Sequence, residues 1–120
     1  MAENSDWVIV FYVEASGRRP VQAFLEGLDA RTQARFRAAI EQLRMRNVGA
    51  TEPLVRHLEE KIWELRVESN TNIYRLLYFF YTGRRIVFLH GFRKKTQQTP
   101  RREIAVASAR SQDFLQRRGV

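Results

Sequence analysis

The sequence predicts a single α+β domain with the element order β-α-α-β-β-β-α over residues 1–120. An apolar run of β-branched and aromatic residues near the start indicates a strand, and two stretches of helical periodicity follow it. After residue 61 the period changes to the alternation that is typical of antiparallel strands. We therefore expect a small, mostly antiparallel sheet packed against a helical pair and a C-terminal helix.

The first half of the chain supplies one strand and the helical pair. Trp7–Val13 is apolar on both faces, which predicts an interior strand covered on both sides. Pro20 suits the first turn of a short helix, because its missing N–H would have no partner there in any case. Asp29 can cap a second helix. The predicted core positions of the two helices are Val21, Phe24, Leu25, Leu28, Phe36, Ile40 and Leu43.

The second half supplies three strands and the last helix. Ile62–Val67 alternates between apolar and charged residues, as a half-buried strand does. Ile73–Tyr81 and Arg85–Arg93 follow after short turn sequences, so the three strands form an antiparallel meander. Thr99 and Pro100 precede the final helix, whose first turn holds an acid where the helix dipole favours one.

The amino-acid composition excludes several classes of protein and several kinds of site. The chain has no cysteine, which excludes disulfides, thiolate metal sites and cysteine nucleophiles. We expect a cytoplasmic protein without cofactor or metal, because there are only two histidines and neither a signal peptide nor an apolar stretch long enough to span a membrane. Residues 56–120 carry all of the excess positive charge, and 18 of the 21 cations in the chain are arginine. This bias suggests a polyanionic partner, although a solvated charged face would show the same composition.

Candidate site residues follow from the alternation of the strands. Glu64 and Arg66 share a face, which we expect to be open, and Arg75 on the next strand should join them because burying an unpaired arginine is costly. His90, Phe92 and Lys94 share one face by the same period, although parity leaves open which face it is. Together they would form a concave patch. Such a set could cleave RNA without a metal, by attack of a 2′-hydroxyl on its own phosphate.

Several assignments have alternatives. Tyr74, Tyr78 and Phe92 could stack on unpaired bases, but an aromatic strand in a small domain is more often core. Lys61 and Glu64 could be an acid–base pair, or Glu64 could form a surface ion pair with an arginine.

Two further features concern charge and titration. His57 lies in the apparent connection before the strands, where we favour a structural or solvent-exposed role. Arg93, Lys94 and Lys95 are consecutive cations at a strand end, which suggests an RNA contact or an ordinary solvated loop.

The segments KIWELRVESNTNIYRLLYFF and RIVFLHGFRKKTQQTPRREIAVASAR resemble the HigB-like, phage-derived branch of the RelE/ParE toxin superfamily. The most specific parts are the WELR pattern that ends at Arg66, the pair Tyr74-Arg75, and the F-x-K-K-T pattern that starts at Phe92. The resemblance implies a RelE-like fold and a ribonuclease that enters the ribosomal A site, cuts mRNA and is held inactive by an antitoxin, often a HigA-like helix-turn-helix protein.

The resemblance also implies roles for individual residues. Arg75 matches an arginine that contacts the scissile phosphate, Lys94 or a neighbour matches a basic residue that assists the leaving group, and Arg66 matches a further basic position. RelE-like toxins carry lysines on the second strand and a tyrosine near the C-terminus, and this chain has neither. The general base is therefore open: Glu64 is the first choice, with Lys61 and His90 as alternatives and ribosomal RNA as a contributor.

Two other functions fit the same resemblance. A ParE-like member would poison DNA gyrase without being an enzyme, and a decayed phage relative would only bind its antitoxin and nucleic acid. For the toxin we expect the antitoxin to shield the basic face, because neutralising phosphate-binding charge inhibits most directly.

Overall fold

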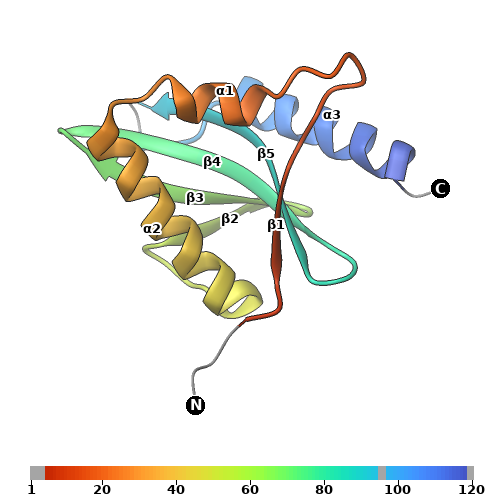
Figure 1. The fold of residues 1–120 in the computed structure, drawn as a ribbon, viewed down its shortest axis with the longest axis horizontal. Coiled ribbons are helices and arrows are strands. Elements are labelled where there is room, and N and C mark those ends of the chain that lie inside the picture. Colours follow the sequence, from red (N-terminus) through yellow and green to blue (C-terminus); the bar gives the residue numbers. More distant parts are fainter. Residues whose placement is uncertain (1–4, 95–96, 119–120) are drawn as a thin grey trace.

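A computed structural model describes residues 5–94 and 97–118, apart from the side chain at position 118. Five strands form one mixed sheet in the order β1-β5-β4-β3-β2, with helices on both of its faces (Figure 1). The elements in chain order are β1 (Val8–Phe11), α1 (Pro20–Glu26), α2 (Ala30–Arg46), the 3-10 turn η1 (Asn47–Gly49), β2 (Val55–Glu59), β3 (Ile62–Ser69), β4 (Asn72–Tyr81), β5 (Arg85–Lys94) and α3 (Arg101–Arg118).

The predicted α+β class is confirmed, but the predicted element order is wrong by one strand. β2 lies in the segment that we expected to be a connection, and it pairs antiparallel with β3 at the edge of the sheet. A bulge between His57 and Glu59 shifts the register there. Because a bulge interrupts the alternation of side chains, the period-2 pattern that identifies a strand is absent from this segment.

β1 is also placed differently from the prediction. It pairs in parallel with β5 and forms the other edge of the sheet, so it is not an interior strand. Its side chains nevertheless pack on both faces, since Ile9 and Phe11 contact one core cluster and Val10 contacts the other. This two-sided packing accounts for the continuous apolar run.

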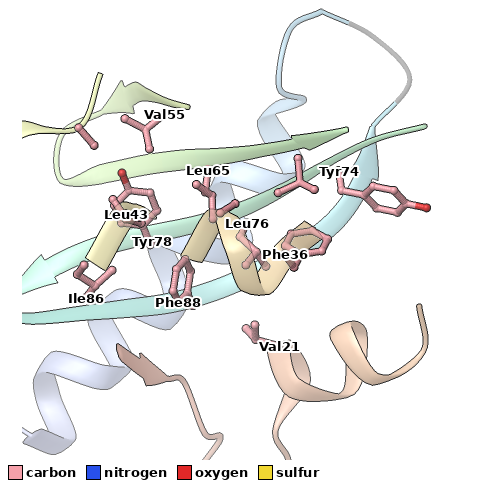
Figure 2. Packing of buried hydrophobic residues seen from close by; sticks show 13 residues of the cluster. Val21, Phe36, Leu43, Val55, Leu65, Tyr74, Leu76, Tyr78, Ile86 and Phe88 are labelled. Atoms are coloured by element: carbon pink, nitrogen blue, oxygen red, sulfur yellow. The ribbon is translucent and has the colours of Figure 1, made fainter. Parts of the chain in front are cut away.

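The first core cluster fills the space between the sheet and the helices α1 and α2. Figure 2 shows Leu65, Leu76 and Phe88 pointing from three neighbouring strands towards Phe36 on α2. Asp29 caps α2 as predicted, because its side chain accepts a hydrogen bond from the backbone N–H of Thr32. These helices cover the face that bears the odd-numbered positions of β3.

The opposite face of the sheet is covered in part by α3. Phe114 and Ala107 of α3 pack with Leu77, Phe79 and other strand residues in the second core cluster. The face that we expected to be open is therefore covered over part of its area by α3, and a cluster of charged residues lies on the same face beside the start of this helix. This region holds the candidate site.

Candidate functional site

Strand pairing brings four cations and one carboxylate together on the α3 face, beside the start of that helix. Glu64 is paired across the sheet with Arg56 on β2 and Leu77 on β4, and Arg66 is paired with Arg75. Lys94 ends β5 on the same face. We call Arg56, Glu64, Arg66, Arg75 and Lys94 the Glu64 cluster.

Glu64 lies at the centre of this cluster and has two close partners. One carboxylate oxygen accepts a hydrogen bond of 2.6 Å from the hydroxyl of Thr99, and the other lies 3.1 Å from Nε of Arg75. The Nε–H of Arg75 makes no aligned hydrogen bond among the described residues, so we treat this contact as an ion pair held by Coulombic attraction. The pair is buried: the exposed fraction is 2% for Glu64 and 1% for Arg75.

Lys94 lies in the same buried region, with an exposed fraction of 4%. Its ammonium donates to the backbone oxygen of Gln97 and, at 3.3 Å, to the hydroxyl of Thr99. Burial, followed by repulsion from Arg75, lowers the pKa of Lys94 to about 8, while Glu64 opposes this effect. Burial also lowers the pKa of Arg75. A lysine with this pKa can donate or accept a proton near neutral pH.

The other two cations form the outer part of the cluster. The side chain of Arg66 is 28% exposed and that of Arg56 is 44% exposed. Their acidic neighbours are distant, with 3.8 Å between Arg66 and Glu68 and 3.7 Å between Arg56 and Glu52. Exposed pairs of this length contribute little energy, so both guanidinium groups can exchange these partners for a phosphate.

The structure thus brings Glu64, Arg66, Arg75 and Lys94 together, as the sequence predicts. The predicted exposure of the patch is wrong, however, because Glu64, Arg75 and Lys94 are all buried. The reason is that the segment before α3 folds over them and supplies the contacts of Gln97 and Thr99. The Glu64–Arg75 ion pair is therefore a buried pair and not a pair on the sheet surface.

His90 lies on the α3 face but is occupied by contacts with that helix. Its Nε2 lies 2.6 Å from a carboxylate oxygen of Glu103, its ring stacks on Phe92, and its Nδ1 lies 3.4 Å from a guanidinium nitrogen of Arg110. Burial lowers the pKa of His90, although Glu103 acts in the opposite direction. These contacts place His90 in the packing of β5 against α3.

The aromatic residues proposed for base stacking are part of the core. Tyr74 faces α2 and packs edge-on against Phe36, so it lies on the opposite face from the Glu64 cluster. Tyr78 is fully buried on that same face, and Phe92 is buried in the second core cluster. The alternative that these rings are core residues is the correct one.

The remaining candidates lie at the periphery or outside the described residues. Lys61 is exposed in the turn between β2 and β3, and Arg93 is exposed near the end of β5. His57 is exposed on β2, where its ring packs against Trp63 and one ring nitrogen lies 2.6 Å from the backbone oxygen of Glu60. Lys95 lies outside the described residues.

Two members of this site do not follow from the sequence pattern. Arg56 lies on β2, which has no period-2 pattern to identify it as a strand, and the sequence marks Thr99 only as the start of a helix. The hydroxyl of Thr99 connects Glu64 and Lys94, and its position just before a helix gave no sign of this. Pairing β2 with β3 would have placed Arg56 directly opposite Glu64.

The described residues contain neither a candidate metal site nor a candidate membrane-spanning helix. No group of three or more His, Asp or Glu side chains that could hold a metal ion occurs within residues 5–94 and 97–118. In the same part of the chain, no helix combines the length and apolar character that crossing a membrane requires.

Comparison with known proteins identifies the family. Residues 23–112 match the model of the family described as "Phage derived protein Gp49-like". A search of curated proteins finds no match to the chain. The Gp49-like family is associated with RelE-like endoribonuclease toxins. Because the match covers most of the chain, the protein belongs to the Gp49-like family, which is part of the RelE/ParE-like toxin superfamily.

Proposed function

We propose that the protein is the toxin of a type II toxin–antitoxin module, a HigB-like enzyme that cuts mRNA on the ribosome. The observation that carries this proposal is the convergence of four cations, one from each of four neighbouring strands, around the buried carboxylate of Glu64. Phosphodiester cleavage produces a crowded dianionic phosphorus, and fixed cations stabilise it in proportion to their proximity. Membership of the toxin superfamily supports the same reaction.

In the proposed reaction Arg66 and Arg56 hold the scissile phosphate, because their guanidinium groups reach solvent. Glu64 accepts the proton of the 2′-hydroxyl, whose oxygen then forms a bond to phosphorus while the bond from phosphorus to the 5′-oxygen breaks. Lys94, which is mostly protonated at pH 7, donates a proton to that leaving oxygen. Arg75 orients Glu64 and adds positive charge behind it. The products are a 2′,3′-cyclic phosphate and a 5′-hydroxyl.

This mechanism requires that RNA displace two contacts of the free protein. The hydroxyl of Thr99 occupies Glu64, and the backbone oxygen of Gln97 together with Thr99 occupies Lys94. A requirement for the ribosome would follow if productive displacement takes place only on mRNA held in the A site. We further propose that a HigA-like helix-turn-helix antitoxin inhibits the protein by covering Arg56 and Arg66.

The test is to sequence RNA ends after brief induction of the protein in bacteria. We expect cuts in translated mRNA with a fixed phase relative to codons, and a loss of about 100-fold for Arg66→Gln and Lys94→Met. Arg37→Gln is the matched control, because Arg37 is an exposed arginine on α2 across the sheet. Unchanged cutting by correctly folded Arg66→Gln and Lys94→Met would refute the assignment.

A ParE-like inhibitor of DNA gyrase is the second candidate, and burial favours it. Arg75 and Lys94 are almost inaccessible in the free protein, which a structural role would explain without any RNA. In this case the same induction would leave mRNA intact and cause DNA damage. It would also leave toxicity unchanged when Lys94 is replaced by methionine.

A further inference from the structure

A cavity lies beside the Glu64 cluster, and the mechanism above assigns no part of the substrate to it. It has a volume of about 860 Å³ and opens between the edge strand β2 and the start of α3. Pockets for small molecules usually measure about 300 to 1,000 Å³, so it has room for a nucleotide. The lining residues that matter here are Arg56, Leu58, Glu59, Gln97, Arg101 and Ile104.

Arg101 makes a two-point contact with Glu59 at this cavity although its side chain is exposed. One guanidinium nitrogen lies 2.6 Å from a carboxylate oxygen of Glu59 and the other lies 3.5 Å from the second oxygen. The exposed fraction of its side chain is 79%. A two-point contact through the guanidinium edge leaves the two flat faces of the group uncovered by Glu59. Such a plane is a stacking surface for an unpaired RNA base.

The cavity is continuous with the Glu64 cluster. Arg56 belongs to both, and Thr99, which also lines the cavity, is bonded to Glu64. Leu58 and Ile104 provide apolar contact, and the side-chain amide of Gln97 can both donate and accept hydrogen bonds. Glu59 and Arg101 neutralise each other, so Arg56 is the cation that can bind a phosphate here. The cavity can therefore hold one uncharged base against Arg101 and one phosphate against Arg56.

We propose that this cavity is a nucleotide subsite in which Arg101 stacks on an unpaired base next to the phosphate held by Arg56 and Arg66. This inference rests on the proposed ribonuclease function and adds a source of sequence preference to it. Glu59 is a positioning residue, because it acts by holding the guanidinium plane of Arg101. Gln97 contacts the edge of the base.

Binding can be measured without catalysis. Hexanucleotides with 2′-O-methyl groups lack the nucleophile, so they are titrated into ¹⁵N-labelled protein as adenosine, cytidine, guanosine or uridine hexamers. We expect shifts at the amides of Leu58 and Ile104 and at Nε of Arg101, and we expect linear polyphosphate to leave these signals in place. Equal shifts with polyphosphate, or no shifts at these positions with any hexamer, would overturn the proposal. Shifts produced only by an acidic peptide would also overturn it.

The matched variants are Arg101→Lys and Arg102→Lys. Both residues lie in the first turn of α3 and are about equally exposed, but Arg102 does not line the cavity. Lysine keeps the charge and removes the plane, so Arg101→Lys should weaken hexamer binding about tenfold while Arg102→Lys changes it less than twofold. Glu59→Gln should have a smaller effect in the same direction as Arg101→Lys. Equal affinities for the two lysine variants would contradict the stacking role.

Cleavage on ribosomes then separates this inference from the proposed function. If the parent protein cuts mRNA, Arg101→Lys should change the base frequency at one position beside the cut, and Arg102→Lys should not. Cutting with unchanged preference in Arg101→Lys would overturn the subsite and leave the ribonuclease intact. Hexamer binding at the cavity without any cutting by the parent protein would support the subsite and refute the ribonuclease.

Discussion

The buried pair of Glu64 and Arg75 predicts an asymmetric response to mutation. At 3.1 Å and an effective dielectric constant of about 20, the attraction between the two charges is about 5 kcal/mol. Removing one member of a buried pair typically costs about 3 to 5 kcal/mol, because the other charge is left without compensation. That cost is a large fraction of the stability of about 5 to 15 kcal/mol that is usual for a domain.

The two single variants should not cost the same. Glu64→Gln leaves Arg75 among Lys94, Arg66 and Arg56, which all repel it. Arg75→Met removes one of these repelling charges and leaves a carboxylate that still has the hydroxyl of Thr99 and three cations nearby. We therefore expect Glu64→Gln to lower the unfolding free energy by about 1 kcal/mol or more beyond the effect of Arg75→Met.

The assay is urea unfolding followed by tryptophan fluorescence, carried out as a double-mutant cycle. The variant with both changes should be more stable than the sum of the single effects predicts, by about 2 kcal/mol. Glu41→Gln is the control, because this glutamate pairs with Arg44 at the surface, and it should change the unfolding free energy by less than about 1 kcal/mol. Additive effects, or a larger loss for Arg75→Met, would refute the reasoning.

Three further predictions concern the same fold. Gly91→Ala should destabilise by about 1 to 3 kcal/mol in urea unfolding, since a Cβ there would lie 2.5 Å from the ring of Phe24, whereas Gly49→Ala has open space and should be nearly neutral. The pKa of Lys94, about 8 in the folded protein, is below its value in the unfolded chain. Between about pH 8 and 10 the unfolded state therefore binds more protons than the folded state. Over this range the unfolding free energy of the parent should rise by up to about 1.4 kcal/mol per pH unit relative to Lys94→Met. Parallel pH profiles would contradict that pKa. Asp29→Ala should remove the cap of α2 and cost about 1 kcal/mol by thermal or urea unfolding, and no change would show that the cap is dispensable.

The periodicity of apolar residues was sufficient to predict most of the helices and strands and to show which residues of a strand share a face. Alternation placed Glu64 and Arg66 together because a pleated strand without a bulge has a period of two. It also placed His90, Phe92 and Lys94 on one face, and that face is the one that carries Glu64. The register of β4 with β5 completes the site by pairing Arg75 with Phe92.

Bulges account for what periodicity missed. The bulge on β2 interrupts the period-2 pattern that would have identified the strand, so the sequence did not predict that Arg56 lies opposite Glu64. A second register shift, between β4 and β5, leaves Leu89 without a partner in the ladder. As a result Leu89 and His90 are consecutive residues that both face α3, where the backbone oxygen of Leu89 accepts a hydrogen bond from Arg110. On that face the ring nitrogens of His90 contact Glu103 and Arg110 of α3.

Burial of the site could not be predicted, because it depends on a contact between segments distant in the sequence. An unpaired arginine avoids burial because losing its hydration is costly, but Arg75 is paired with Glu64 and can therefore be buried. The hydroxyl of Thr99 contacts both Glu64 and Lys94, and the members of the Glu64 cluster that reach solvent are Arg56 and Arg66. If the protein cleaves RNA, the substrate first meets these two arginines, and binding energy from the neighbouring cavity is then available to displace Thr99 from Glu64. A site built in this way would remain inactive towards short RNA that fails to fill the cavity.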